Sequence, residues 1–80
     1  MTKSTIETTK GLCVVAMTRR IMDKLSISSD EAFKKLITME CYRLLMEDDT
    51  RLFLETNDFL CQCCENELDG GDEALYRMIA

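Results

Sequence analysis

The chain of 80 residues contains no histidine, no proline and no tryptophan. Without histidine it lacks the commonest general base and the commonest transition-metal ligand. A Ser-His-Asp or Cys-His catalytic site and a mixed Cys/His zinc site are therefore excluded within one chain. The three glycines, Gly11 and the pair Gly70-Gly71, match neither a dinucleotide-binding nor a Walker pattern. These absences favour a protein that is not an enzyme and carries no cofactor.

Long apolar runs are also missing. The longest covers residues 12–17, whereas about 20 residues are needed to span a membrane, and it is too short for a signal-peptide core. The five cysteines are an odd number, and three of them lie within residues 61–64. A secreted disulfide framework is usually even and spread along the chain. We therefore expect reduced thiols, a cytoplasmic location and no membrane contact.

Charge is distributed unevenly along the chain. Residues 1–43 carry a net charge of +3 and residues 44–80 a net charge of −8. This polarity suits two copies aligned head to tail, or a basic partner on the C-terminal half. A solvated polar surface is the plainer explanation.

Hydrophobic spacing predicts a first helix over about residues 5–25, after a polar start at residues 1–5 that we expect to be disordered. The side chains expected to face inward are Val14, Val15, Thr18, Ile21, Met22 and Leu25. Other apolar side chains lie off this stripe or at the margin of a later helix: Leu12, Cys13, Ala16, Met17, Met39 and Tyr42. Such an excess indicates either an interaction surface for a protein partner or a second copy, or a central helix covered by its own chain.

Residues 28–31 (SSDE) have the form of a capping box, in which the Ser28 hydroxyl accepts from the Glu31 amide and the Glu31 carboxylate accepts from the Ser28 amide. They predict a second helix that ends near Ile37. Thr38 is expected to cap a further helical segment over residues 39–47, either as a separate helix or as the bent continuation of the second. The inward side chains are expected to be Ala32, Phe33, Leu36, Ile37, Cys41, Leu44 and Leu45.

The remaining residues predict a turn, a tether and one or two helices. Residues 48–50 (DDT) are typical of a turn, and residues 51–55 should place Leu52 or Phe53 in the core. Thr56 is the expected cap of a helix that Gly70-Gly71 ends, and residues 73–79 can form two last turns. The inward side chains of the helix that Thr56 caps are expected to be Phe59, Leu60, Cys63, Cys64 and Leu68. Those of the last turns are Leu75, Met78 and Ile79. The fold predicted for residues 1–80 is one all-α domain, a compact bundle of four to five short helices.

The cysteine cluster is the sharpest local motif. On a helix Cys61 and Cys64 share a side, which makes them candidate thiolate ligands of a metal ion, while Cys63 points away from Cys61. The alternative is that Cys63 and Cys64 are small core residues. Cys61 is expected to be the most exposed of the three and a candidate redox thiol, although Glu65 is close and no cation is nearby to lower its pKa.

A helix-turn-helix can be drawn from residues 17–25 through residues 26–28 to residues 29–37, with Lys34 and Lys35 exposed. The local basic set would be Arg19, Arg20, Lys24, Lys34 and Lys35. Because phosphate contacts dominate DNA affinity, the sequence pI of about 4.6 does not favour this alternative. The acidic clusters lack the ligand spacing of an EF-hand.

Three stretches carry a resemblance to a known kind of protein: residues 25–33 (LSISSDEAF), residues 42–45 (YRLL) and residues 50–56 (TRLFLET). They resemble small bacterial helical proteins of uncharacterised function. Some of those look like the small partner encoded beside a larger toxin-like gene of ADP-ribosyltransferase type. The resemblance covers about residues 12–68, implies the helical architecture and carries over no catalytic residue; the cysteine cluster is outside its motifs.

The function expected from these observations is a cytoplasmic, non-catalytic protein–protein interaction module. A small regulatory or antitoxin-like subunit is one form of it, and a homodimer is another. The alternatives are a DNA-binding transcriptional regulator of helix-turn-helix type and a thiol-based metal or redox sensor.

Overall fold

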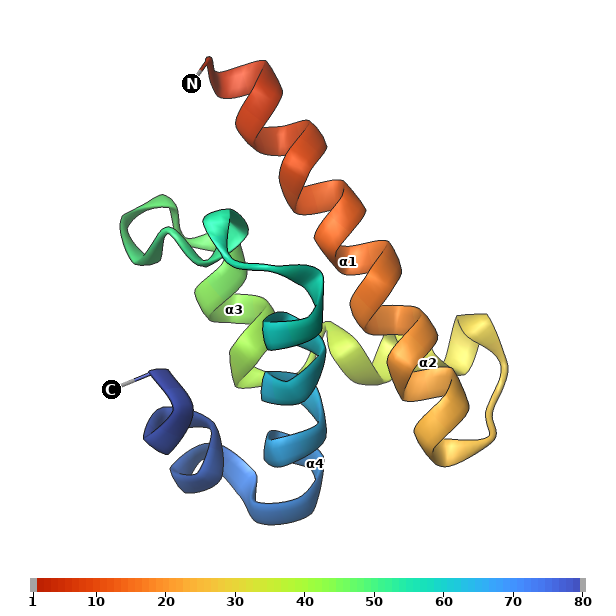
Figure 1. The fold of residues 1–80 in the computed structure, drawn as a ribbon. Coiled ribbons are helices and arrows are strands. Elements are labelled where there is room, and N and C mark those ends of the chain that lie inside the picture. The colour runs from red at the N-terminus through yellow and green to blue at the C-terminus, as the bar shows by residue number, and fades with distance from the viewer. Residues whose placement is uncertain (1, 80) are drawn as a thin grey trace.

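The computed structural model describes residues 2–79, which form four α-helices and two short 3₁₀ turns. In order these are α1 (Lys3–Leu25), α2 (Ser29–Leu36), α3 (Glu40–Met46), η1 (Asp48–Thr50), η2 (Leu52–Leu54) and α4 (Asn57–Ile79). No strand occurs among these residues, which confirms the predicted all-α bundle. The other elements pack along one side of α1, and its N-terminal turns extend past them (Figure 1).

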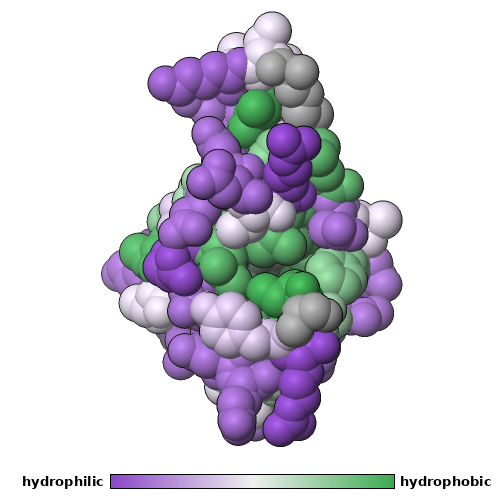
Figure 2. All heavy atoms as spheres, turned by 90° about the vertical axis from the view of Figure 1, so that its left-hand side faces the viewer, coloured by the Kyte–Doolittle hydropathy of each residue, from purple (hydrophilic) through white to green (hydrophobic). Residues whose placement is uncertain are grey.

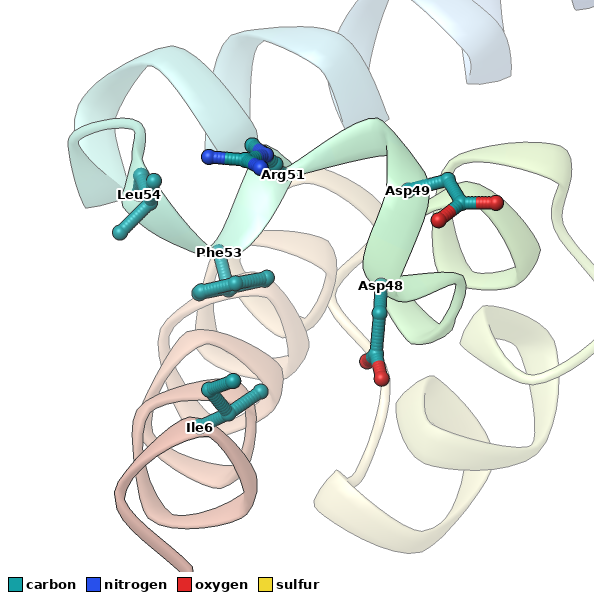
Figure 3. Close-up of a pocket in the computed structure, with 6 residues that line it drawn as sticks. All are labelled: Ile6, Asp48, Asp49, Arg51, Phe53 and Leu54. Atoms are coloured by element: carbon teal, nitrogen blue, oxygen red, sulfur yellow. The ribbon is translucent and has the colours of Figure 1, made fainter. Parts of the chain in front are cut away.

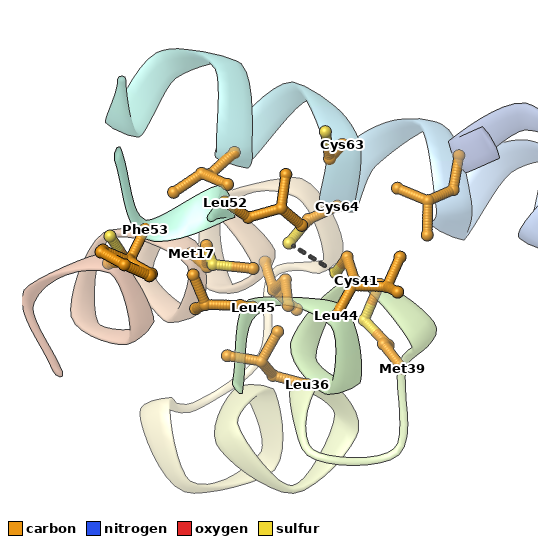
Figure 4. Packing of buried hydrophobic residues seen from close by; sticks show 14 of the residues in the cluster. Met17, Leu36, Met39, Cys41, Leu44, Leu45, Leu52, Phe53, Cys63 and Cys64 are labelled. Carbon is orange, nitrogen blue, oxygen red and sulfur yellow. Dashed lines mark hydrogen bonds between the residues drawn. The ribbon is translucent and has the colours of Figure 1, made fainter. Parts of the chain in front are cut away.

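One core joins all the elements except η1. It contains buried side chains from α1 (Cys13, Met17, Ile21), α2 (Ala32, Leu36), the α2–α3 link (Met39), α3 (Cys41, Leu44, Leu45), η2 (Leu52, Phe53) and α4 (Leu60, Cys63, Cys64, Leu75). Part of this packing is drawn in Figure 4. Each large aliphatic side chain removed from water contributes about 1.5–3 kcal/mol, so this single cluster is the main source of stability.

The buried stripe of α1 matches the predicted one only in part: Ile21 is buried as expected, and Val14 and Met22 pack against the core while partly exposed. It runs through Lys10, Cys13, Met17 and Ile21, which follow the helical spacing of three and four residues. Val15 and Leu25 were expected inside and are instead 49% and 41% exposed. Two apolar rows lie side by side on this helix. The aliphatic side chains made the row with Val15 and Leu25 the expected one. The row that packs against the other elements is instead the one that starts at Lys10.

The start of α1 also differs from the prediction. Thr2 is the N-cap, and its hydroxyl accepts a hydrogen bond of 3.2 Å from the Thr5 amide. Lys3 is already helical, so the expected disorder of residues 1–5 is wrong for residues 2–5. Met1 lies outside the described residues.

The capping box begins α2 as predicted, with a different second bond. The Ser28 hydroxyl accepts from the Glu31 amide at 3.2 Å and donates to the Glu31 carboxylate at 3.4 Å. Ala32 and Leu36 are fully buried, but Phe33 and Ile37 remain 42% and 45% exposed, so placing those two in the core was wrong. An eight-residue helix that packs on α1 buries only one narrow row.

A carboxylate from α4 caps α3. Glu67 accepts hydrogen bonds from the backbone amides of Glu40 and Cys41, both at 2.8 Å. Thr38, the predicted cap, instead donates to the Lys35 carbonyl at the end of α2. The inward positions Cys41, Leu44 and Leu45 are confirmed. The N-terminus of a helix favours negative charge, so Glu67 fastens α3 to α4 by both hydrogen bonding and electrostatics.

The link between α3 and α4 follows its predicted course. Arg51 adopts a left-handed conformation (φ +55°), and both Leu52 and Phe53 then enter the core. The Thr56 hydroxyl caps α4 by accepting from the Phe59 amide at 3.1 Å, as predicted.

Gly71 divides α4 into two parts. Its φ of +73° and ψ of −166° belong to a region open almost only to glycine, and the chain folds back into a C-terminal arm, residues 72–79 (Figure 1). Leu75 anchors this arm in the core. The Tyr76 hydroxyl donates to Glu40 at 3.0 Å. The predicted break at Gly70-Gly71 is confirmed.

The charge polarity of the sequence is partly used inside the molecule. Arg20 of α1 pairs with Glu65 at 2.6 Å and Asp58 at 3.5 Å, and Lys24 pairs with Asp69 at 3.2 Å. The basic first half and the acidic second half therefore meet at the α1–α4 contact. Such partly exposed pairs each contribute little free energy, but they fix which side of α1 receives α4.

Replacing Glu67 by alanine should remove the cap of α3. Two charge-assisted hydrogen bonds are lost, so we expect a destabilisation of about 2 kcal/mol and a Tm lower by about 10 °C in thermal denaturation followed by circular dichroism. Glu73→Ala, at an exposed site on the arm, is the control and should leave Tm nearly unchanged. Equal Tm values for the two variants would contradict the role given to Glu67.

Candidate functional site

Lys10 is the one charged side chain in the core of residues 2–79. Its ammonium group donates to the Met46 carbonyl at 2.9 Å and forms an ion pair with Asp48. It also lies 5.6 Å from the centre of the Phe53 ring, within the range of a cation–π contact. Lys10 thus connects α1 to the end of α3, to η1 and to η2 in one place.

Lys10 was not among the residues predicted to be functional, although its position in the sequence carries a signal. It lies three residues before Cys13 and seven before Met17, on the same helical face. A lysine is accommodated in such a row because its aliphatic stem packs with apolar neighbours while its amino group reaches polar partners. Those partners come from residues 46–53 and are visible only in the folded chain.

A groove of about 540 Å³ lies beside Lys10. We call it the α1–η groove, because it is formed by the projecting end of α1 and by η1 and η2. Its lining residues are Ile6, Asp48, Asp49, Arg51, Phe53 and Leu54. Ile6 and Phe53 point toward one another, with Leu54 and Arg51 to one side and the two aspartates to the other (Figure 3). Leu54 is 57% exposed, so an apolar side chain stands uncovered at the rim.

The chemistry of the α1–η groove suits binding. Asp48 is neutralised by Lys10, and the Lys10 amino group is occupied by its own partners. Asp49 and Arg51 are exposed and form no ion pair among residues 2–79. The groove therefore offers an apolar floor, a free carboxylate and a free guanidinium, which can orient a segment of another chain.

The predicted interaction residues are scattered by the fold. Leu12 is exposed at 64%, Ala16 and Tyr42 are half-buried, and Cys13, Met17 and Met39 belong to the core. The expectation that these last three form a surface is wrong, because they lie in the row of α1, or at the start of α3, that faces the other elements. Val15 joins Leu12 on the outer face of α1.

The cysteines are all free and buried. Cys61 is not the exposed thiol that was expected; its thiol contacts the Ala16 carbonyl at 3.5 Å. Burial raises its pKa, although Arg20 lies near enough to oppose that shift, so the expectation of no nearby cation was also wrong. Burial likewise raises the pKa of Cys63 to about 11. These thiols are poor nucleophiles at neutral pH.

The candidate metal ligands Cys61 and Cys64 are not brought together. Cys64 lies against Cys41 of α3, with 3.2 Å between the sulfur atoms, while Cys61 faces α1. Within residues 2–79, no group of three or more cysteine, aspartate or glutamate side chains is arranged to hold a metal ion.

The basic residues considered for DNA binding are only partly free. Lys34 and Lys35 are exposed as expected, but Lys34 pairs with Asp30 of its own helix. Arg20 and Lys24 are directed to carboxylates of α4. Arg19 and Lys35 are the members of the set without an ion pair among the described residues.

Across residues 2–79, no helix has the length and apolar character required to cross a membrane. No family model, no curated protein and no solved structure matches the chain.

Replacing Lys10 by methionine should destabilise the protein by about 1–3 kcal/mol, because the Met46 carbonyl loses its buried donor. The methionine retains much of the apolar stem, so the loss reports the ammonium contacts. Urea denaturation measures the change. Lys34→Met removes an exposed pair on α2 and should cost less than about 0.5 kcal/mol. A Lys10→Met protein as stable as the wild type would mean that the ammonium contacts contribute nothing net.

Proposed function

We propose that this protein is a non-catalytic interaction module that binds a segment of a protein partner in the α1–η groove. The observation that supports this most directly is the uncovered Leu54 beside Ile6 and Phe53, in a groove of about 540 Å³. That volume lies in the range of ligand-binding clefts. Apolar side chains gathered in a concave, polar-rimmed surface are typical of interaction sites.

The position of α1 supports the same proposal. Its first turns, residues 3–9, reach beyond the other elements (Figure 1), and only Ile6 and Thr9 among them are even half-buried. Helical stability in proteins comes mainly from packing an apolar face. A partner segment in the groove would pack against Ile6 and so support the end of the helix that the chain itself leaves largely exposed.

The charges of the groove limit the partner segment. Asp49 on one side favours a lysine or arginine, while Ile6, Phe53 and Leu54 favour one or two apolar anchors beside it. Arg51 on the other side can form an ion pair with a carboxylate of the partner. We therefore propose a short helical or extended segment with an apolar residue next to a basic one.

The face of the molecule that lies to the left in Figure 1 also carries a hollow of apolar side chains with polar side chains around it (Figure 2). A small cytoplasmic regulatory or antitoxin-like subunit is the form of the proposal that the resemblance of residues 25–33, 42–45 and 50–56 supports. Self-association as a homodimer is a second form, in which another copy supplies the segment.

Leu54→Glu should abolish partner binding and leave the fold intact, because this exposed side chain contributes little to the core. The measurement is selection of a random peptide library on the immobilised protein, followed by affinity titration of the enriched peptides. We expect enriched peptides with an apolar residue beside a lysine or arginine, and at least a tenfold weaker affinity for Leu54→Glu, which corresponds to about 1.4 kcal/mol.

Ile37→Glu is the matched control, because Ile37 is similarly exposed but lies at the end of α2, away from the groove. It should bind like the wild type. Peptides that bind Leu54→Glu unchanged, or that are lost only with Ile37→Glu, would place the binding surface elsewhere. Light scattering of the free protein separates the homodimer form from a monomer that awaits a different partner.

DNA binding is the alternative with less support, since three of its five basic residues pair with carboxylates. Retention on DNA at low salt that is lost on Lys34→Glu with Lys35→Glu would favour it over the interaction module.

A further inference from the structure

Cys41 and Cys64 are the two side chains whose arrangement the proposed function leaves unexplained. Cys41 comes from α3 and Cys64 from α4, and their sulfur atoms lie 3.2 Å apart in the core (Figure 4). Both side chains are buried. The two helices are therefore in contact through a pair of thiols.

The other three cysteines have no such arrangement. Cys63 is adjacent to Cys64 in sequence, but successive residues point to different sides of a helix. Cys61 contacts a backbone carbonyl of α1, and Cys13 lies on α1 itself. Among the five cysteines, all of which the structure describes, the recorded thiol–thiol contact joins Cys41 and Cys64. The fold thus selects one of ten possible pairings.

We propose that Cys41 and Cys64 are a redox pair that a hydroperoxide converts reversibly to a disulfide fastening α3 to α4. This inference is independent of the α1–η groove. It replaces the expected redox thiol Cys61 with a pair that the sequence could not assemble, because its members come from separate helices.

The reaction needs one molecule of hydrogen peroxide. One of the two sulfurs loses its proton and attacks one peroxide oxygen; the O–O bond breaks, that cysteine becomes a sulfenic acid, and the leaving hydroxide takes up the lost proton as water. The other sulfur then attacks the sulfenic acid sulfur, the S–S bond forms and the S–O bond breaks. The departing hydroxide takes the proton of the second thiol as a second water. Two thiols are oxidised by two electrons, and one peroxide is reduced.

Burial governs the chemistry of the pair. The hydrogen bond with Cys64 and burial raise the pKa of Cys41, and the nearby Glu67 carboxylate adds to that rise. Either sulfur can donate in their mutual contact, so either thiol can attack the oxidant while the other resolves the sulfenic acid. Burial also makes the pair slow, since peroxide reaches it only when the core opens locally.

The Cys41–Cys64 disulfide would change the stability of the bundle and not a binding surface. It would close residues 42–63 into a loop, which restricts the unfolded chain more than the folded one. It would also reinforce the contact that Glu67 makes with the first turn of α3. To form it, the sulfurs, 3.2 Å apart, need to approach by about 1 Å.

The test is oxidation of the full chain with hydrogen peroxide under native conditions, followed by alkylation in denaturant and peptide mapping without reductant. We expect a monomer in which a disulfide joins Cys41 and Cys64 and three of the five thiols are alkylated. Tm should rise on the order of 10 °C and return on addition of dithiothreitol. Cys41→Ala should give no disulfide and no rise in Tm.

Cys63→Ala is the matched control, because Cys63 is as buried as Cys64 and next to it in the chain, and it should still form the bond. If this variant unfolds, the peptide map of the oxidised wild-type protein is by itself the test of which cysteines are joined. The inference is overturned if the disulfide joins Cys63 or Cys61 as often as Cys64, if it links two chains, or if it forms only in denaturant. It is also overturned if peroxide yields only sulfinic acid.

Discussion

The structure depends on one narrow row of α1. Lys10, Cys13, Met17 and Ile21 are the buried residues of that helix, and α2, α3, η2 and α4 all contact it. A helix that packs on one side leaves the other side to solvent, which accounts for the exposure of Leu12 and Val15. Because α1 is longer than α2, α3, η2 and the part of α4 that precedes the kink at Gly71, its first turns are left largely exposed, and the α1–η groove lies beside them.

Lys10 is the first residue of this buried row and lies next to the α1–η groove. Its amino group holds the Met46 carbonyl and Asp48, and Phe53 lies against it. The same contacts that complete the core therefore also shape the proposed binding surface. The thiol pair Cys41–Cys64 lies elsewhere, between α3 and α4, and its proposed disulfide would act on the bundle itself.

Most local signals could be predicted from the sequence, although the cap expected at Thr38 was wrong, and contacts between distant segments could not. Ser28, Thr56 and Gly71 act on their own neighbours, so the helix boundaries near them could be predicted. The cap of α3 by Glu67, the partners of Lys10 and the meeting of Cys41 with Cys64 each join residues far apart in the chain. The inward row of α1 was also missed, because two apolar rows compete on that helix and only the position of its neighbours decides between them.

The central claim is that the first turns of α1, residues 3–9, are largely exposed in the free protein and pack against the core chiefly through Ile6. Amide hydrogen exchange of the dilute monomer, followed by NMR, measures this directly. The account predicts strong protection over residues 13–25 and exchange faster by orders of magnitude at Glu7, Thr8 and Thr9, whose helical hydrogen bonds lie outside the packed body. Equal protection from Glu7 to Leu25 in a verified monomer would contradict it.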